Sequence, residues 1–262
     1  GGQNPESGFS FWWRGPSETF SFEIVSHQGL VSFYISTPPS KYELIQQQIQ
    51  AQYPDALITP LADYTIFDPK SSVAAGYLTF ERDRYFPIKT FRKLESDPLN
   101  AITNPLAKLE KGEAVAIQYV VRSAPPTWRL QGINVVRQLQ TGKTLKEIKE
   151  QHTVLGFLRG VIDVFKTPEA LEKEKNHQKE RKHSQMEEEM IKGLEEKAAK
   201  AGFEVNIRVV AASLKPERAV ALLQNVISAY SQYNIYEYGN SFKKIIPPKR
   251  EAVFNFLYKT FT

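Results

Sequence analysis

Apolar and polar residues alternate along several short stretches of the chain, starting near its N-terminus. Residues 20–25 and 30–35 alternate in this way on either side of His27-Gln28-Gly29. Because successive side chains of a strand point to opposite faces and glycine permits a tight turn, this pattern predicts a β-hairpin. Four later stretches are also predicted to be strands, at 56–61, 77–82, 114–121 and 203–210.

Apolar residues recur at spacings of three and four in four other stretches, which predicts amphipathic helices. The stripe is clearest in residues 217–231, where it contains Ala219, Leu222, Leu223, Val226, Ile227 and Tyr230. A helix over 40–53 is bounded by Ser40, a favoured N-cap residue, and by Pro54. The other two helices are expected over 97–111, ending at Gly112, and over 128–139.

Three times along the chain, a strand ends near a serine, meets a proline and enters a helix. The three junctions are Ser36-Thr37-Pro38, Ser123-Ala124-Pro125 and Ser213-Leu214-Lys215-Pro216. This order of elements predicts an α+β fold with largely antiparallel sheets and helices on one face. The weak repeat also allows two ferredoxin-like lobes, although three such coincidences can arise by chance.

A long helical insertion separates the second and third of these units, over about residues 143–201. Its charged half is expected to be a solvated helix with intrahelical ion pairs, and a flexible crossing between lobes is the alternative. Its apolar half contains Thr153–Phe165. This segment is expected to pack against the sheet or a partner subunit, although its composition is also typical of a helix at a membrane surface.

We therefore divide the chain into four parts: a lead at 1–16, a first α+β lobe at 17–142, the insertion at 143–201, and a second α+β portion at 202–262 that completes the sheet. The lead begins Gly1-Gly2, which resembles a cloning tag remnant, and continues with aromatic residues at 9–13. These rings are expected to cap the core, or alternatively to lie beside a membrane segment. The aromatic run 254–261 stops in mid-pattern, so we expect a piece of a longer polypeptide.

Composition excludes several kinds of chemistry. Hydrophobic residues make up 41% of the 262 residues and charged residues 24%, as in an ordinary soluble protein. No apolar run approaches the roughly 18 residues that a membrane-spanning helix needs. The chain has no cysteine, which excludes disulfides, thiolate metal sites and cysteine nucleophiles. Its four histidines do not have the spacing of familiar zinc sites.

The segment Gln140-Thr141-Gly142-Lys143-Thr144 contains the last residues of a phosphate-binding loop. Such a loop also needs a glycine five positions before the second one, and that position is Arg137. Gly142 is therefore expected to end the preceding helix. Glutamate clusters at 187–189 and 195–196 are expected on a solvated helix surface. We expect no catalytic residue, no metal site and no cofactor in this chain.

Two basic clusters are candidates for nucleic-acid binding. The first contains Arg82, Arg84, Lys89, Arg92 and Lys93, interleaved with Tyr85, Phe86 and Phe91. Basic groups bind phosphates, and aromatic rings can stack on bases. The second cluster contains Lys243, Lys244, Lys249 and Arg250. Neither forms a known binding motif, so a solvated loop is the alternative, and the net charge of +5 supports only weak attraction to nucleic acid.

Several segments resemble, in the same order, a region of one bacterial protein family. They are FSFEIV at 20–25, FYISTP at 33–38, QAQYPDA at 50–56, PIKTF at 87–91, LAKLEKGE at 106–113 and GFEVNIR at 202–208. Gln52-Tyr53-Pro54-Asp55 is the most characteristic piece, and the similarity extends over about 17–245. The chain resembles the region preceding the motor in type IV secretion and conjugative DNA-transfer ATPases, which are HerA/FtsK-like proteins common in candidate-phyla bacteria.

This resemblance implies membrane segments upstream and a RecA-type motor downstream, where ATP and Mg would bind. The chain itself would be a non-catalytic, cytoplasmic domain at the inner face of the cell membrane that anchors, orients or oligomerises the motor. Its partners would be further copies of itself or other secretion-system subunits, with the exposed insertion and the aromatic ends as attachment points. The alternatives are a nucleic-acid-binding module that feeds DNA to the motor, and an enzyme with a site between the lobes.

Overall fold

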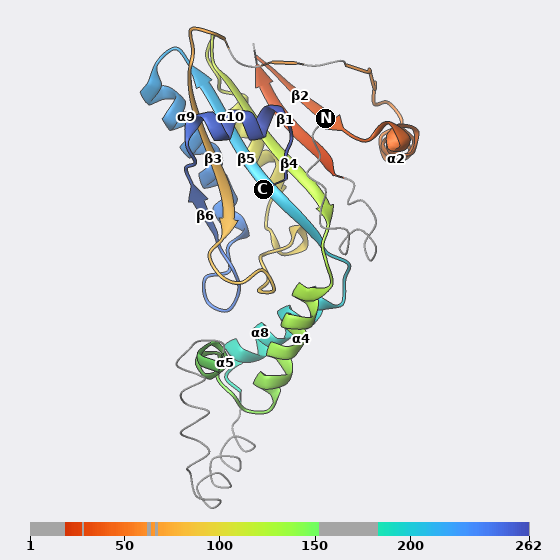
Figure 1. The fold of residues 1–262 in the computed structure, drawn as a ribbon, viewed down its shortest axis with the longest axis vertical. Helices are drawn as coiled ribbons and strands as arrows, with labels where there is room; N and C mark the ends of the chain where they lie inside the picture. The colour runs from red at the N-terminus through yellow and green to blue at the C-terminus, as the bar shows by residue number, and fades with distance from the viewer. Residues whose placement is uncertain (1–18, 28, 62–63, 66–67, 152–182, 262) are drawn as a thin grey trace, which may run out of the picture.

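The computed structural model describes residues 19–27, 29–61, 64–65, 68–151 and 183–261 (Figure 1). Their strands form a single six-stranded antiparallel sheet with the order β2-β1-β4-β5-β3-β6. The strands are β1 (Phe20–His27), β2 (Leu30–Ser36), β3 (Ser72–Phe80), β4 (Ala114–Ser123), β5 (Phe203–Ser213) and β6 (Phe242–Ile245). Strands β1 and β2 form the predicted hairpin, and Gly29 in its turn has a φ of 82°, which suits a residue without a Cβ.

Within the described residues, seven α-helices accompany the sheet. They are α2 (Tyr42–Gln52), α3 (Pro98–Leu106), α4 (Thr127–Gln140), α5 (Leu145–Gln151), α8 (Gln185–Ala198), α9 (Pro216–Ala229) and α10 (Lys249–Leu257). Short 3-10 helices also occur at Pro39–Lys41, Phe91–Lys93 and Tyr230–Tyr233. Helix α8 begins with a capping box, in which the side chains of Ser184 and Glu187 each bind the other residue's backbone N–H.

The strand order contains one ferredoxin-like unit. Strands β3 and β4 flank β5 and are joined through α3, while β5 and β6 flank β3 and are joined through α9. Two such split β-α-β crossovers, interlocked in one antiparallel sheet, define the ferredoxin-like arrangement. The β1–β2 hairpin extends this unit beside β4. The α+β class is therefore confirmed, with one ferredoxin-like unit and one sheet in place of two lobes.

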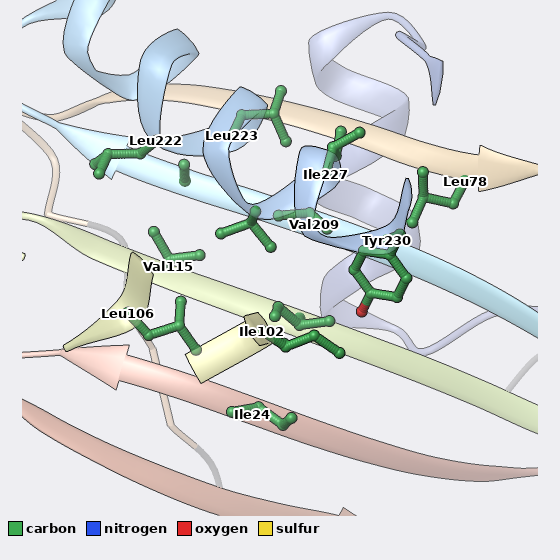
Figure 2. Close-up of a cluster of buried hydrophobic side chains, with 13 residues drawn as sticks. Ile24, Leu78, Ile102, Leu106, Val115, Val209, Leu222, Leu223, Ile227 and Tyr230 are labelled. Atoms are coloured by element: carbon green, nitrogen blue, oxygen red, sulfur yellow. The ribbon is translucent and has the colours of Figure 1, made fainter. Parts of the chain in front are cut away.

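Helices cover both faces of the sheet, whereas the sequence pattern predicted one face. Helices α3 and α9 pack on one face, over the cluster shown in Figure 2. This cluster includes Ile24, Leu106, Ile117, Val209, Leu222 and Val226. Helix α10 covers the opposite face, where Ala252 and Phe256 pack on small side chains such as Ala116, Val210 and Ala212. Alanine on a strand gives a weak periodic signal, which is why the second face escaped the prediction.

Helices α4, α5 and α8 form a separate unit, which we call the arm. The arm joins the ends of β4 and β5 and extends beyond the sheet in Figure 1. It has its own buried cluster, which comprises Phe86, Val135, Val136, Leu139, Ile148, Met190 and Leu194. The predicted insertion at 143–201 thus corresponds to part of the arm, while Thr153–Phe165 lies outside the described residues.

Two local predictions were wrong. Residues 56–61 form no strand and belong to the connection between α2 and β3, where Leu57 is 93% exposed. A strand needs a neighbour, and no segment pairs with this stretch among the described strands. Helix α3 ends at Leu106 and not near Gly112, because Gly112 belongs to a separate turn before β4: it has a φ of 84°, and the Glu113 N–H donates to the Glu110 carbonyl over 3.0 Å.

Candidate functional site

The five basic residues proposed for nucleic-acid binding fall into two groups. Arg82 and Arg84 are held by the protein: the Arg82 guanidinium donates to the Gly239 carbonyl over 2.9 Å, and Arg84 forms a 2.9 Å ion pair with Glu204. Lys89, Arg92 and Lys93 lie on the surface around the 3-10 helix Phe91–Lys93. The structure therefore separates two arginines that bind partners within the protein, of which Arg84 still has a side chain 57% exposed, from the three surface cations Lys89, Arg92 and Lys93.

The interleaved aromatic residues divide in the same way. Phe86 is fully buried in the cluster of the arm, and the ring of Tyr85 packs against it at 4.8 Å between centroids. Phe91 is exposed, and the Arg92 guanidinium lies 5.7 Å from its ring centroid. Phe91 is therefore the one ring of these three that is accessible to a base.

The P-loop-like segment is a helix-to-helix turn. Gly142 has a φ of 88° directly after α4, and its N–H donates to the Leu139 carbonyl over 2.8 Å. Thr144 and Glu147 then cap α5, since the Thr144 N–H donates to the Glu147 carboxylate and the Glu147 N–H donates to the Thr144 hydroxyl. The prediction that Gly142 ends the helix is confirmed. A phosphate-binding loop needs free backbone N–H groups, whereas those of Gly142, Thr144 and Glu147 are used in the two helix caps.

The acidic and histidine side chains of the described residues form no cluster of three or more that could hold a metal ion. Glu188, Glu189, Glu195 and Glu196 are exposed on α8, as expected for a solvated helix, whereas the side chain of Glu187 is only 15% exposed and caps the start of the helix. In the same part of the chain, no helix is both long and apolar enough to cross a membrane. All strands of the described residues join one sheet, so these residues do not form the two separate lobes between which an enzyme site was considered.

Polar side chains form a continuous row across the face that α10 covers, and the sequence analysis did not anticipate it. Glu23, Gln118, Arg208 and Tyr77 lie directly opposite one another on four adjacent strands. We call these four residues the polar row. Gln118 connects the two charges: its amide nitrogen donates to Glu23 over 3.1 Å, and its oxygen accepts from Arg208 over 2.9 Å. Gln118 and Arg208 have no exposed surface.

The polar row binds the end of α10. Arg208 donates to the carbonyls of Asn255 and Thr260, and Gln118 donates to the carbonyl of Phe256. The last carbonyls of a helix have no partners within the helix and carry a partial negative charge, so a buried cation beneath them is favourable. The row therefore fixes the C-terminal turn of α10 on the sheet.

Other groups whose pKa values are shifted also bind structural partners. The Arg218 guanidinium, which donates to Glu113 over 2.7 Å, lowers the pKa of that carboxyl and ties α9 to the start of β4. Burial raises the pKa of Tyr119 to about 12, and its hydroxyl pairs with that of Tyr230. Burial lowers the pKa of Lys197 to about 8, and its ammonium donates to the carbonyls of Arg84 and Phe86.

One face of the sheet is covered over only part of its length. Under α3 and α9, Ile24, Ile117 and Val209 are at most 7% exposed. Farther along the same face, Phe22 is 38%, Val205 43% and Phe203 67% exposed. Helix α9, with 14 residues, is about 21 Å long, whereas the 11 residues of β5 extend about 36 Å, so the helix cannot cover the strand.

The uncovered area continues onto the edge strand. Phe33 lies opposite Ile24 and Ile35 opposite Phe22, so both belong to this face, and they are 62% and 38% exposed. We call Phe22, Phe33, Ile35, Phe203 and Val205 the open face. It borders a groove of about 410 Å³ between β3, β5 and β6, with Phe80, Ile88 and Phe242 in its lining. The open face is thus an apolar surface with an adjoining hollow.

Comparison with known proteins gives a family and no function. No curated protein and no solved structure matches the chain. A family model described as a domain of unknown function, DUF8128, matches residues 7–261. Because this match extends over nearly the whole chain, the chain belongs to the DUF8128 family.

Proposed function

We propose that this domain is a non-catalytic assembly domain that acts by protein–protein contacts. Its context would be that of the region preceding the motor of a secretion-type or conjugative DNA-transfer ATPase, on the cytoplasmic side of the membrane. In this role it would bring subunits together or orient the motor, while ATP hydrolysis would take place on another part of the polypeptide.

The observation that carries this proposal is the open face. Large contiguous apolar patches are uncommon on proteins that act alone, because they bind other proteins or aggregate. Three of the five open-face residues are phenylalanines, and buried aromatic side chains contribute much of the binding energy in protein interfaces. A partner that covers Phe22, Phe33 and Ile35 would remove this apolar area from water.

The charged groups support the same role. The buried charges Glu23 and Arg208 lie in the polar row under α10, and Glu113 is bound by Arg218. Each of these groups is used to hold one element against another. These buried polar contacts make the domain rigid. An assembly domain needs such rigidity in order to hold its partners in fixed positions.

The association state of the native protein tests this function. We expect it to form oligomers or complexes, and the double variant Phe22→Asp/Ile35→Asp to weaken that association by about tenfold or more, because charges would enter an apolar contact. Light scattering coupled to size-exclusion chromatography measures the change. The control is Val220→Asp, at an exposed position on α9 outside the open face, which should leave association unchanged. A native protein that stays monomeric and binds no subunit would overturn the proposal.

Delivery of DNA to the motor is the second candidate, favoured by exposed Lys89, Arg92 and Lys93 around the exposed ring of Phe91. Cations beside an accessible ring suit single-stranded nucleic acid. This function requires an affinity for DNA that falls steeply with salt and is lost when the three residues are changed to glutamine. No binding to single- or double-stranded DNA at low salt would exclude it.

A further inference from the structure

The two edges of the sheet differ in their protection against pairing with another chain. Strand β6 has only four residues, includes Lys243 and Lys244, and is followed by Pro247-Pro248. Short length, lysine and proline are the devices by which natural proteins protect an edge strand. Strand β2 has seven residues, LVSFYIS, with no charge, no proline and no glycine. Its Leu30, Phe33 and Ile35 are exposed.

The outer edge of β2 has backbone groups available for a further strand. His27 and Leu30 close a two-residue loop and therefore form a hydrogen-bonded pair, and such pairs alternate along an antiparallel ladder. By this alternation, Val31, Phe33 and Ile35 direct their N–H and C=O groups away from β1. Among the described residues, the backbone hydrogen bonds of β2 go to β1 alone.

The helix that follows β2 is packed only weakly in the described structure. Helix α2 has no buried residue, and its main contact is with the 3-10 helix Pro39–Lys41 just before it. An isolated helix of this length is marginal in water, so it gains from packing against another surface. Residues 30–53 include only two charged residues among 24, Lys41 and Glu43, whereas charged residues make up 24% of the whole chain.

We propose that a second copy of this chain pairs its β2 with β2 of the first, in antiparallel orientation about a twofold axis at Phe33. This pairing rests on the assembly function proposed above and names its partner. Phe33 of each copy would exchange two backbone hydrogen bonds with Phe33 of the other. Val31 would lie opposite Ile35, and the two sheets would become one continuous sheet with the two open faces joined on one side.

A second copy fits this edge better than a charged partner would. In this pairing Phe33 faces Phe33, and every other residue of β2 faces a residue of the same strand in the second copy. Charges of one sign on such a strand would repel each other, and β2 has no charge. Depletion of charge and enrichment of aromatic residues are typical of the centre of an interface. The antiparallel arrangement also places α2 of each copy beside the hairpin end of the other, which gives this helix a surface to pack on.

Cysteine cross-linking tests the register directly, because these 262 residues contain no cysteine. In the variant Phe33→Cys, the two cysteines would face each other across the axis with Cα atoms about 5.5 Å apart. A short bismaleimide should then convert most of the protein to a covalent dimer on a denaturing gel. The matched control is Ile245→Cys on β6, which is similarly exposed and should remain monomeric.

The variant Phe33→Lys gives an independent measurement. Lysine is well tolerated on an edge strand, and two lysines facing each other across the axis should weaken dimerisation by about tenfold or more in sedimentation equilibrium. Two results overturn the β2 pairing and leave the assembly function standing. In one, the protein associates but Phe33→Cys gives no cross-link; in the other, Phe33→Lys does not weaken association. If Ile245→Cys is cross-linked as efficiently as Phe33→Cys, the pairing is also overturned. A chain that is monomeric at every concentration overturns self-association as well.

Discussion

Arg208 lies beneath the last turn of α10, where several helix carbonyls lack partners within the helix. Its guanidinium donates to the carbonyls of Asn255 and Thr260 and to the side chain of Gln118, and it faces the ring of Tyr77 at 5.5 Å. Burial lowers its pKa, but an arginine keeps its charge at any pH at which the protein is folded. A cation is therefore kept in the interior, and its hydrogen bonds offset the cost of removing it from water.

The variant Arg208→Met tests this single residue. Methionine fills a similar volume and supplies no donor, so the carbonyls of Asn255 and Thr260 and the oxygen of Gln118 would lose this partner. We expect the free energy of unfolding to fall by about 3 kcal/mol, measured by urea denaturation. The same change at Arg122, which is partly exposed and pairs with Glu204, should cost less than about 1 kcal/mol. Equal losses at both positions would contradict the role of the polar row.

At the scale of elements, the arm and the sheet have separate interiors. Leu139 of α4 and Leu194 of α8 are each 1% exposed and belong to the cluster of the arm, which shares no residue with the clusters on the two faces of the sheet. Lys197 of α8 joins the arm to the connection that follows β3, because its ammonium donates to the carbonyls of Arg84 and Phe86 in that connection. Separate interiors allow one part to open while the other stays folded.

The variant Leu194→Ala should therefore loosen the arm first. The cavity should cost about 2–5 kcal/mol, and amide hydrogens of α4 and α8 should exchange faster while those of β4 and β5 keep their protection. Hydrogen–deuterium exchange followed by mass spectrometry measures this pattern. The comparison variant is Val209→Ala in the central strand β5, which should reduce protection across the sheet. Loss of protection in the sheet on changing Leu194 would show that the two parts unfold as one.

The elements that sequence patterns predicted best are those with one apolar side. The stripe of α9 and the hairpin of β1 and β2 were predicted correctly, and three of the five open-face residues, Phe22, Phe33 and Ile35, lie in this hairpin. The alternation gave no sign that Glu23 is buried under α10, where it is 2% exposed. The signal that could have revealed the polar row is Gln118, which lies within the apolar run of β4, and Arg208, which directly precedes the apolar run Val209–Ala212 of β5.

Whether an apolar residue is covered depends on helix length and on the path of the chain, which local patterns do not contain. Phe203 and Val209 lie on the same face of β5, and only the reach of α9 makes the first exposed and the second buried. The local sequence of the basic cluster does not indicate that Arg82 and Arg84 bind residues more than a hundred positions later in the chain. Such partners are set by the tertiary fold.

At the scale of the molecule, the direction of the arm is set at the junction between α8 and β5. Gly202 lies against the indole of Trp128, the first buried residue of α4, and a Cβ there would come within 2.5 Å of the ring. The Gly202 carbonyl also accepts from the N–H of Ala124, at the end of β4, over 3.0 Å. This close approach joins both connections of the arm at one point.

The variant Gly202→Ala should change how the arm is held against the sheet. Because an indole ring cannot bend away, we expect the free energy of unfolding to fall by about 1–3 kcal/mol and α4 to shift. Spin labels on cysteines introduced at Leu130 in α4 and Val220 in α9, both exposed, report the distance between the two parts. Gly132→Ala is the control, since its Cβ would meet Tyr85 at an ordinary 3.4 Å. An unchanged distance in Gly202→Ala would contradict this account.

The position of β3 in the sheet has a consequence for synthesis on the ribosome. Its neighbours are β5 and β6, and its first residue, Ser72, pairs with Ser213, which is 141 positions later. As the chain emerges, β1, β2 and β4 can associate early, whereas β3 must wait until the whole arm and β5 have been made. Until then the β5-facing edge of β4 and both edges of β3 are unpaired, so we expect chains truncated before β5 to be prone to aggregate.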